Sequence, residues 1–119
     1  MTKERTYYCC IQYCPDRCRA EALNVGVVVY CPGYQYLGCK MTDDYSRLEK
    51  IFPIVPQNLK ITLDGFANRL QYENFPDLES LEHFIDSRAN DIRMTSPRVA
   101  RKRGDLDQQL QDMFVELVQ

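Results

Sequence analysis

Charged side chains crowd a short segment that follows the first apolar stretch of the chain. The segment "CPDRCRAEALN" carries two carboxylates, Asp16 and Glu21, with Arg17 and Arg19 between them. Paired carboxylates can act as general acid and general base, or hold a metal ion. Ion pairs with the neighbouring arginines would satisfy the same carboxylates without any reaction. Both interpretations stay open at the level of the sequence.

The same segment can instead form a recognition site. Asn24 begins the most apolar run of the chain, "NVGVVVY", so its side chain and that of Glu21 would be held by a buried strand. Rigid support of this kind suits binding, although Asn24 could also hydrogen-bond backbone groups of the turn. The candidate binding residues are Asp16, Arg19, Glu21, Asn24, Arg88 and Arg93.

A basic run nearer the C-terminal end is a weaker candidate for phosphate binding. It lies in the segment "SPRVARKRGD". A guanidinium group binds phosphate in a bidentate manner, whereas a solvated loop is the ordinary structure of a charge run. No aromatic residue is interleaved with the cations, so base stacking is not indicated. The four cations are Arg98, Arg101, Lys102 and Arg103.

The six cysteines and the single histidine do not form a recognisable reactive site. Only Cys14 and Cys18 have a spacing near that of a zinc ligand pair, and no histidine lies near them in the sequence. We therefore expect reduced thiols that pack as small apolar side chains. His83 is expected to face solvent, away from any site that would use it as a base. We expect no catalytic residue, no metal and no cofactor.

Length and composition indicate one ordinary globular domain over residues 1–119. A chain of 119 residues that is 45% hydrophobic and 27% charged can bury about two-thirds of its unfolded surface. The formal net charge of −2 argues against a dedicated nucleic-acid binder. No apolar run approaches the ~20 residues of a membrane span, and the first ten residues lack the apolar region of a signal peptide. We expect a cytoplasmic protein that does not contact a membrane.

Hydrophobic periodicity predicts strands first and helices afterwards. Gly26, in the middle of an apolar strand, indicates a bulge or a close backbone approach, and Pro32-Gly33 suits a type II turn. Gly65 lies inside a helical pattern at a cost of roughly 1 kcal/mol. The expected strands cover 6–14, 23–31, 35–41 and 91–96, and the expected helices begin near Thr42, near Pro56 and at Asp77.

The last helix, from Asp105, has the clearest pattern. Asp105 and Gln108 resemble a capping box. A wide apolar stripe follows, which must be buried, and we expect the domain's own sheet to cover it because so large an exposed patch is unusual. The fold class is therefore α+β, an antiparallel sheet of about four strands with three to four helices packed on it. The stripe consists of Leu106, Leu110, Met113, Phe114, Leu117 and Val118.

The order of several blocks resembles a bacterial family of small proteins of unknown function. These blocks are "YCPDRCRAEALNVGVVVYCP", "RLEKIFP", "SRANDIRMTSPR" and "LQDMFVELV". Members are often encoded beside HipA-like serine/threonine kinases, so the resemblance implies a kinase partner. We expect a non-catalytic binding or regulatory protein. The alternative is an enzyme that acts on a phosphate-bearing substrate through Asp16, Arg19 and Glu21, together with Arg88 and Arg93.

Overall fold

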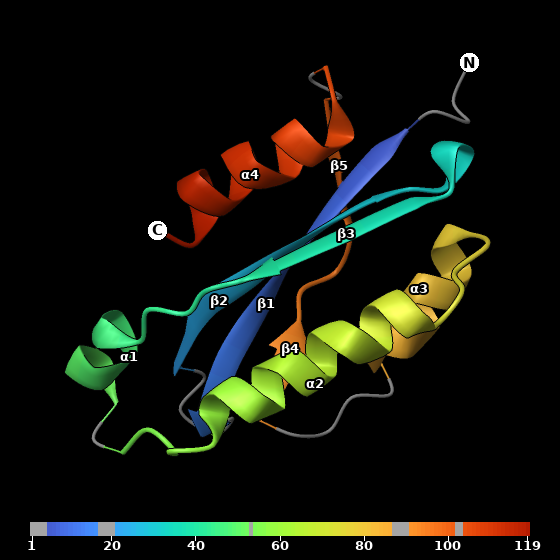
Figure 1. The fold of residues 1–119 in the computed structure, drawn as a ribbon. Helices are drawn as coiled ribbons and strands as arrows, with labels where there is room; N and C mark the ends of the chain where they lie inside the picture. Colours follow the sequence, from blue (N-terminus) through green and yellow to red (C-terminus); the bar gives the residue numbers. More distant parts are fainter. Residues whose placement is uncertain (1–4, 17–20, 53, 87–90, 102–103) are drawn as a thin grey trace.

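The structure is a computed structural model that describes residues 5–16, 21–52, 54–86, 91–101 and 104–119. Its helices and strands form one antiparallel sheet with helices on both faces (Figure 1). In chain order the elements are β1 (Thr6–Asp16), β2 (Glu21–Cys31), the 3-10 turn η1 (Pro32–Tyr34), β3 (Tyr36–Met41), α1 (Ser46–Ile51), α2 (Leu59–Tyr72), α3 (Leu78–Asp86), β4 (Ile92–Met94), β5 (Arg98–Ala100) and α4 (Leu106–Leu117).

The sheet is organised around its long first strand. The strand order is β3-β2-β1-β4, and β5 also pairs with β1. The short strands occupy successive parts of one edge of β1, because β4 pairs with residues 11–13 and β5 with residues 6–8. The predicted α+β class is confirmed. β5 is a fifth strand that the sequence analysis treated as part of a basic loop.

The helices form two layers of unequal depth. In Figure 1, α2 and α3 lie on one side of the sheet and α4 on the other. The α2–α3 core joins β1 and β2 to the apolar faces of three helices. Its buried residues are Cys9, Ile11, Tyr13, Val25, Val28, Tyr30, Leu48, Phe52, Leu59, Leu63, Phe66, Leu70, Leu81, Phe84, Ile92 and Met94.

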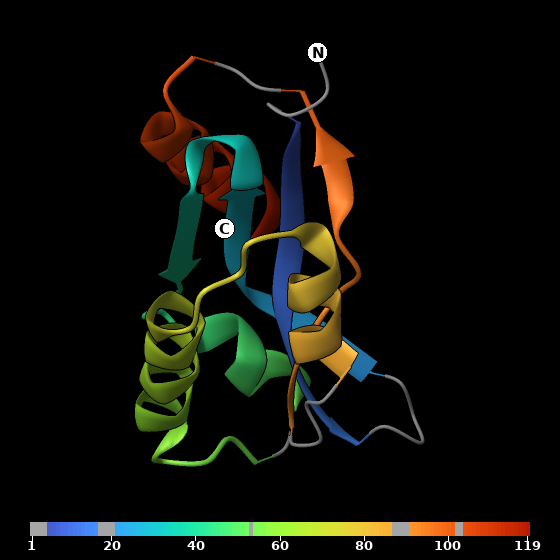
Figure 2. The same cartoon turned by 90° about the vertical axis from the view of Figure 1, so that its right-hand side faces the viewer.

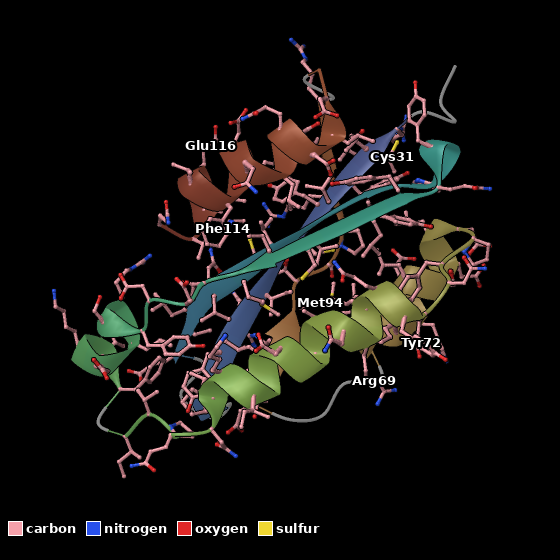
Figure 3. All side chains as sticks on the ribbon, viewed as in Figure 1. Cys31, Arg69, Tyr72, Met94, Phe114 and Glu116 are labelled. Carbon is pink, nitrogen blue, oxygen red and sulfur yellow. The ribbon has the colours of Figure 1, made fainter. Side chains whose placement is uncertain are left out.

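The α4 core is smaller. Phe114 points from α4 towards the sheet and Glu116 points away from it (Figure 3). The expectation that the last helix packs on the domain's own sheet is confirmed. The predicted capping box is wrong, because Asp105 makes no side-chain cap hydrogen bond and Gln108 Nε2 donates instead to Asp112 Oδ1 at 3.0 Å. The buried residues of the α4 core are Val27, Val29, Leu110, Met113, Phe114 and Val118.

Two predicted turns have a different structure. The first two strands extend to Asp16 and from Glu21, so the connection shrinks to residues 17–20, which lie outside the described part of the chain. The hairpin turn is not a type II turn with positive φ at Gly33. It is the 3-10 turn η1, which Gln35 closes with φ 51° and an N–H donated to the Pro32 carbonyl at 3.1 Å.

Polar side chains set where two of the helices begin. Thr42 Oγ1 accepts the Asp44 N–H at 3.1 Å, and Asp44 Oδ1 accepts the Ser46 N–H at 3.1 Å. These local bonds compete with helical ones, so α1 begins at Ser46 rather than near Thr42. Asp77 caps α3 as predicted, with its Oδ1 accepting the Ser80 N–H at 2.9 Å.

The second helix also begins later than expected. α2 starts at Leu59, after a turn in which the Leu59 N–H donates to the Pro56 carbonyl at 3.2 Å. The predicted strand over 91–96 is present as the shorter β4. No helix in the described part of the chain is long and apolar enough to cross a membrane.

Candidate functional site

Among the helices that the structure describes, none packs mainly on the β1 half of the sheet face that carries α4. α4 packs mainly on β2 and β3, and β1 and β5 lie to its side (Figure 2). Tyr8, Cys10 and Gln12 of β1 point to this side. Tyr8 packs with the α4 core whereas Cys9 and Ile11 belong to the α2–α3 core, and side chains alternate along a strand. We call this surface the open face. It consists of Tyr8, Cys10, Gln12, Arg93 and Arg98.

A β-bulge in β2 brings Asn24 to the same side of the sheet. Ile11 is opposite Gly26 but Gln12 is opposite Asn24, so β2 contains one extra residue, Val25. Because side chains alternate along a strand, one extra residue moves every preceding side chain to the other face. Val25 is therefore buried in the α2–α3 core, and Asn24 lies on the α4 side next to Gln12.

Gly26 is the residue that allows this bulge. A Cβ atom at this position would lie 2.5 Å from Met41 Sδ and 3.0 Å from the Lys40 carbonyl oxygen of β3. The Met41 side chain can move away, but the Lys40 carbonyl belongs to the backbone of β3, so a larger residue would require β3 to shift by a few tenths of an ångström. The expectation of a bulge and a close backbone approach at Gly26 is confirmed.

Three side chains on neighbouring strands form a continuous hydrogen-bonded line, which we call the polar row. Arg93 of β4, Gln12 of β1 and Asn24 of β2 are direct partners in the strand register. Arg93 Nε donates to Gln12 Oε1 at 2.9 Å, and Gln12 Nε2 donates to Asn24 Oδ1 at 2.9 Å. Arginine can only donate, so it fixes which way both amides point.

The polar row ends on the C-terminus of α4. Asn24 Nδ2 donates to the Leu117 carbonyl at 3.0 Å, and Arg47 Nη1 donates to the Val118 carbonyl. The last carbonyls of a helix have no partner inside the helix, and a cation is favourable beside them. The Asn24 side chain therefore hydrogen-bonds a backbone group, which was one of the two hypotheses for this residue. The backbone belongs to α4 rather than to the adjacent turn.

A second arginine and a thiol complete the open face. Arg98 is exposed and stands opposite Tyr8 in the strand register. Cys10 lies between Tyr8 and Gln12 and is half-buried. Burial raises the pKa of the Cys10 thiol, and the nearby charge of Arg98 lowers it by less. A thiol with a raised pKa stays protonated near neutral pH, so Cys10 is not an activated nucleophile.

The two arginines stand apart along β1. Their register partners, Tyr8 and Gln12, are four residues apart, which is about 13 Å at the rise of a strand. Arg93 is also held by its bond to Gln12. The pair therefore suits two separate acidic groups on an extended surface better than one phosphate held between them.

A comparison with family models finds one match that covers most of the chain. Residues 8–118 match the model described as "Protein of unknown function (DUF3037)". The chain belongs to the DUF3037 family. No curated protein and no solved structure matches it.

The DUF3037 chain brings two of the six predicted binding residues together. Asn24 and Arg93 are joined through Gln12, which the sequence analysis missed. The available signal was a polar residue at an even position of an otherwise apolar strand. Glu21 is exposed at the start of β2, opposite Asp16 and three residues before Asn24. Arg19, Arg88 and the side chain of Asp16 lie outside the described residues.

The basic run of the DUF3037 chain is not a loop throughout. Arg98 belongs to β5 and joins the open face. Arg101 is exposed, and its carbonyl accepts Gln109 Nε2 at 2.9 Å. Lys102 and Arg103 lie outside the described residues, so a four-cation phosphate site stays a prediction.

The remaining sequence candidates are the histidine and the cysteines. His83 is exposed on α3, as expected. Within the described ranges, no group of three or more His, Cys, Asp or Glu side chains is placed to hold a metal ion. The cysteines described are thiols rather than halves of disulfides: Cys9, Cys10, Cys14, Cys31 and Cys39.

A hollow of about 680 Å³ lies between the η1 hairpin tip and the α2–α3 connection. Within the lining of this hollow, Tyr30 Oη donates a hydrogen bond to the Phe75 carbonyl at 2.5 Å. Burial raises the pKa of Tyr30 to about 12. Glu73 on its rim pairs with Arg69 at 3.9 Å. The phenol and the carboxylate of this hollow already have partners within the chain, so they stabilise the fold. The open face is therefore the better candidate site.

Proposed function

We propose that the DUF3037 chain is a non-catalytic binding protein whose open face docks on an acidic surface of a protein partner. The observation that carries this proposal is the polar row, which holds the Arg93 guanidinium in a fixed position on a sheet. A side chain fixed in advance loses less conformational entropy on binding. Arg98 adds a second cation at a distance that suits an extended partner.

The most concrete partner that we propose is a HipA-like serine/threonine kinase, which the family resemblance implies through gene neighbourhood. Complementary charges at an interface raise the association rate and select the partner. A regulatory contact of this kind needs cations held on a rigid surface and no reactive group. The protonated Cys10 and the hydrogen-bonded Arg93 meet both requirements.

The test is a binding titration of the purified chain against a HipA-like serine/threonine kinase from the same genome. We expect the double variant Arg93→Glu/Arg98→Glu to bind about tenfold more weakly or worse, with a smaller dependence on salt. Arg101→Glu is the matched control, because it makes the same change at an exposed arginine that follows β5. Equal losses in the double variant and the control, or no loss in either, would contradict docking through the open face.

The enzyme alternative is tested in parallel with phosphate monoesters and nucleotides as substrates. A non-catalytic protein shows no turnover above the buffer rate. Turnover that disappears in Asp16→Asn/Glu21→Gln would overturn the binding proposal in favour of an enzyme acting through these carboxylates.

A further inference from the structure

The outer edge of β3 carries backbone groups that no described strand pairs. β3 is the last strand on its side of the sheet (Figure 2). The Thr42 N–H donates to the Val25 carbonyl at 2.7 Å, and successive residues of an antiparallel strand bond alternately to one side and the other. The odd-numbered residues of β3 therefore point their N–H and C=O groups away from β2, and no described residue bonds these groups. They are Leu37, Cys39 and Met41.

This edge lacks the features by which proteins usually protect an unpaired strand. Such edges are commonly covered, interrupted by proline or guarded by charged side chains. β3 contains no proline, and its one charged residue, Lys40, lies on the α4 side with its ammonium 5.0 Å from the centre of the Phe114 ring. The outward backbone groups of β3 thus stay open to a second extended chain.

The hollow of about 680 Å³ lies at one end of this edge. Leu37 belongs to its lining and also packs against the α2–α3 core. Residues that pair across two strands place their side chains on the same face of the sheet. A chain added along β3 would therefore point the side chain opposite Leu37 into the hollow. In strand addition, backbone hydrogen bonds give affinity and such pockets give specificity.

The lining of the hollow suits a long basic side chain. Tyr36, Tyr72 and Phe75 contribute aromatic rings, whose faces attract cations. Glu73 contributes a carboxylate, and the described residues of the lining include no lysine or arginine. The pair of Glu73 with Arg69 is long, at 3.9 Å, and both side chains are exposed. A pair of this kind is weak, so Glu73 can accept a second cation.

We propose that β3 accepts an extended segment of a partner protein as a further strand, with an arginine or lysine opposite Leu37 held in the hollow. The aliphatic stem of that side chain packs on the aromatic rings, and its charged end lies at Glu73. The open face presents cations to an acidic surface, whereas this site takes a basic segment. The proposal therefore does not rest on the proposed function of the open face.

An NMR titration of the isotope-labelled full chain tests this proposal. The probe is a blocked heptapeptide in which threonine and valine alternate and arginine replaces the central valine. We expect the backbone amides of Leu37, Cys39 and Met41 to shift on binding. Glutamate or phenylalanine in place of the arginine should weaken binding, glutamate by about tenfold or more.

Methylation of single peptide nitrogens tests the strand pairing itself. Methylation of the arginine nitrogen removes an N–H that would donate to β3 and should abolish binding. Methylation of the next threonine nitrogen is the matched control. That N–H points away from β3, so most of the binding should remain.

A charge reversal tests the hollow. Glu73→Arg should weaken binding of the arginine peptide about tenfold and strengthen binding of the glutamate peptide. Glu49→Arg makes the same change at an exposed position of α1 and should alter neither. No binding at millimolar peptide, equal or tighter binding of the glutamate or phenylalanine peptide, or equal losses with both methylated peptides would each overturn the proposal. Shifts of the same amides that depend on protein concentration without peptide would also overturn it, because a second copy would then occupy the edge.

Discussion

The two faces of the sheet differ in what covers them and in what they can do. The α2–α3 face is covered by apolar side chains from three helices, and α2 and α3 bring aromatic rings into edge contact, as between Phe66 and Phe84 at 6.0 Å. The α4 face has a small core over β2 and β3, and beside it a row of polar side chains that hydrogen-bond one another. One face stabilises the fold, while the other holds charged groups in fixed positions.

A single extra residue, Val25, decides which face of the sheet Asn24 occupies. Without Val25 as the extra residue of the bulge, Asn24 would point into the α2–α3 core and the polar row would lose its link to α4. Gly26 makes room for β3 at the same place. The apolar core and the polar row thus depend on one local irregularity of β2.

The largest expected effect tests whether the α4 core belongs to the fold. Phe114 is 3% exposed, and the Lys40 ammonium lies 5.0 Å from the centre of its ring. Phe114→Ala should lower the free energy of unfolding by about 3–5 kcal/mol, as truncation of a buried aromatic side chain does. Chemical denaturation measures this change. An unchanged unfolding curve would mean that α4 does not stabilise the isolated chain.

A smaller effect tests the bulge. Gly26→Ala should lower the free energy of unfolding by about 1–3 kcal/mol, because the added methyl group overlaps Met41 and the β3 backbone. Gly65→Ala is the matched control. Its methyl group meets nothing in the chain, so it should stabilise the monomer by about 0.5–1 kcal/mol. If both variants are stabilised, the close approach at Gly26 is wrong.

The smallest effect compares two adjacent thiols. Cys9 is fully buried in the α2–α3 core, and burial raises its pKa to about 12. Cys10 is half-buried on the open face, and Arg98 offsets part of the rise in its pKa. The thiolate is the species that reacts, so an alkylating reagent at pH 8 should label Cys10 in the folded protein well before Cys9. Mass spectrometry measures the two labelling rates. Equal rates would contradict the distinction between the two faces.

The same thiols predict how stability changes in alkali. The pKa of Cys9 and that of Cys39 rise from 9.0 to about 12 on folding. The unfolded chain therefore loses these protons at lower pH than the folded chain, and the unfolding free energy falls as pH rises above about 9. Below pH 9 the contribution is fully present. Replacing both thiols with alanine should flatten this decline, which a series of unfolding curves at different pH measures.

Long periodic patterns could be predicted from the sequence, and pairings between distant residues could not. The stripe on α4 predicted both the helix and its burial, because it repeats over three turns. β5 was missed because Arg98 and Arg101 suggested a solvated loop. The strands β1 and β2 were likewise predicted too short, because the charged residues Asp16 and Glu21 suggested a loop.

The candidate site was only partly predictable for a related reason. The sequence pointed to Asn24 and Arg93 separately, but the residue between them, Gln12, becomes visible only from the strand register. That register includes a one-residue bulge, and a shift of one residue reverses which face each side chain occupies. Such a shift is set by tertiary packing of β2 against β1 and β3.

The most direct test of the central claim is to break the polar row at its middle. Gln12→Met keeps the size of the side chain and both arginines but removes the bonds to Arg93 and Asn24. If the row holds Arg93 in position for binding, affinity for the proposed HipA-like kinase partner should fall severalfold in the folded variant, as a titration of wild-type and variant chains measures. Unchanged affinity would contradict the account, because Arg93 would then bind without support from the row.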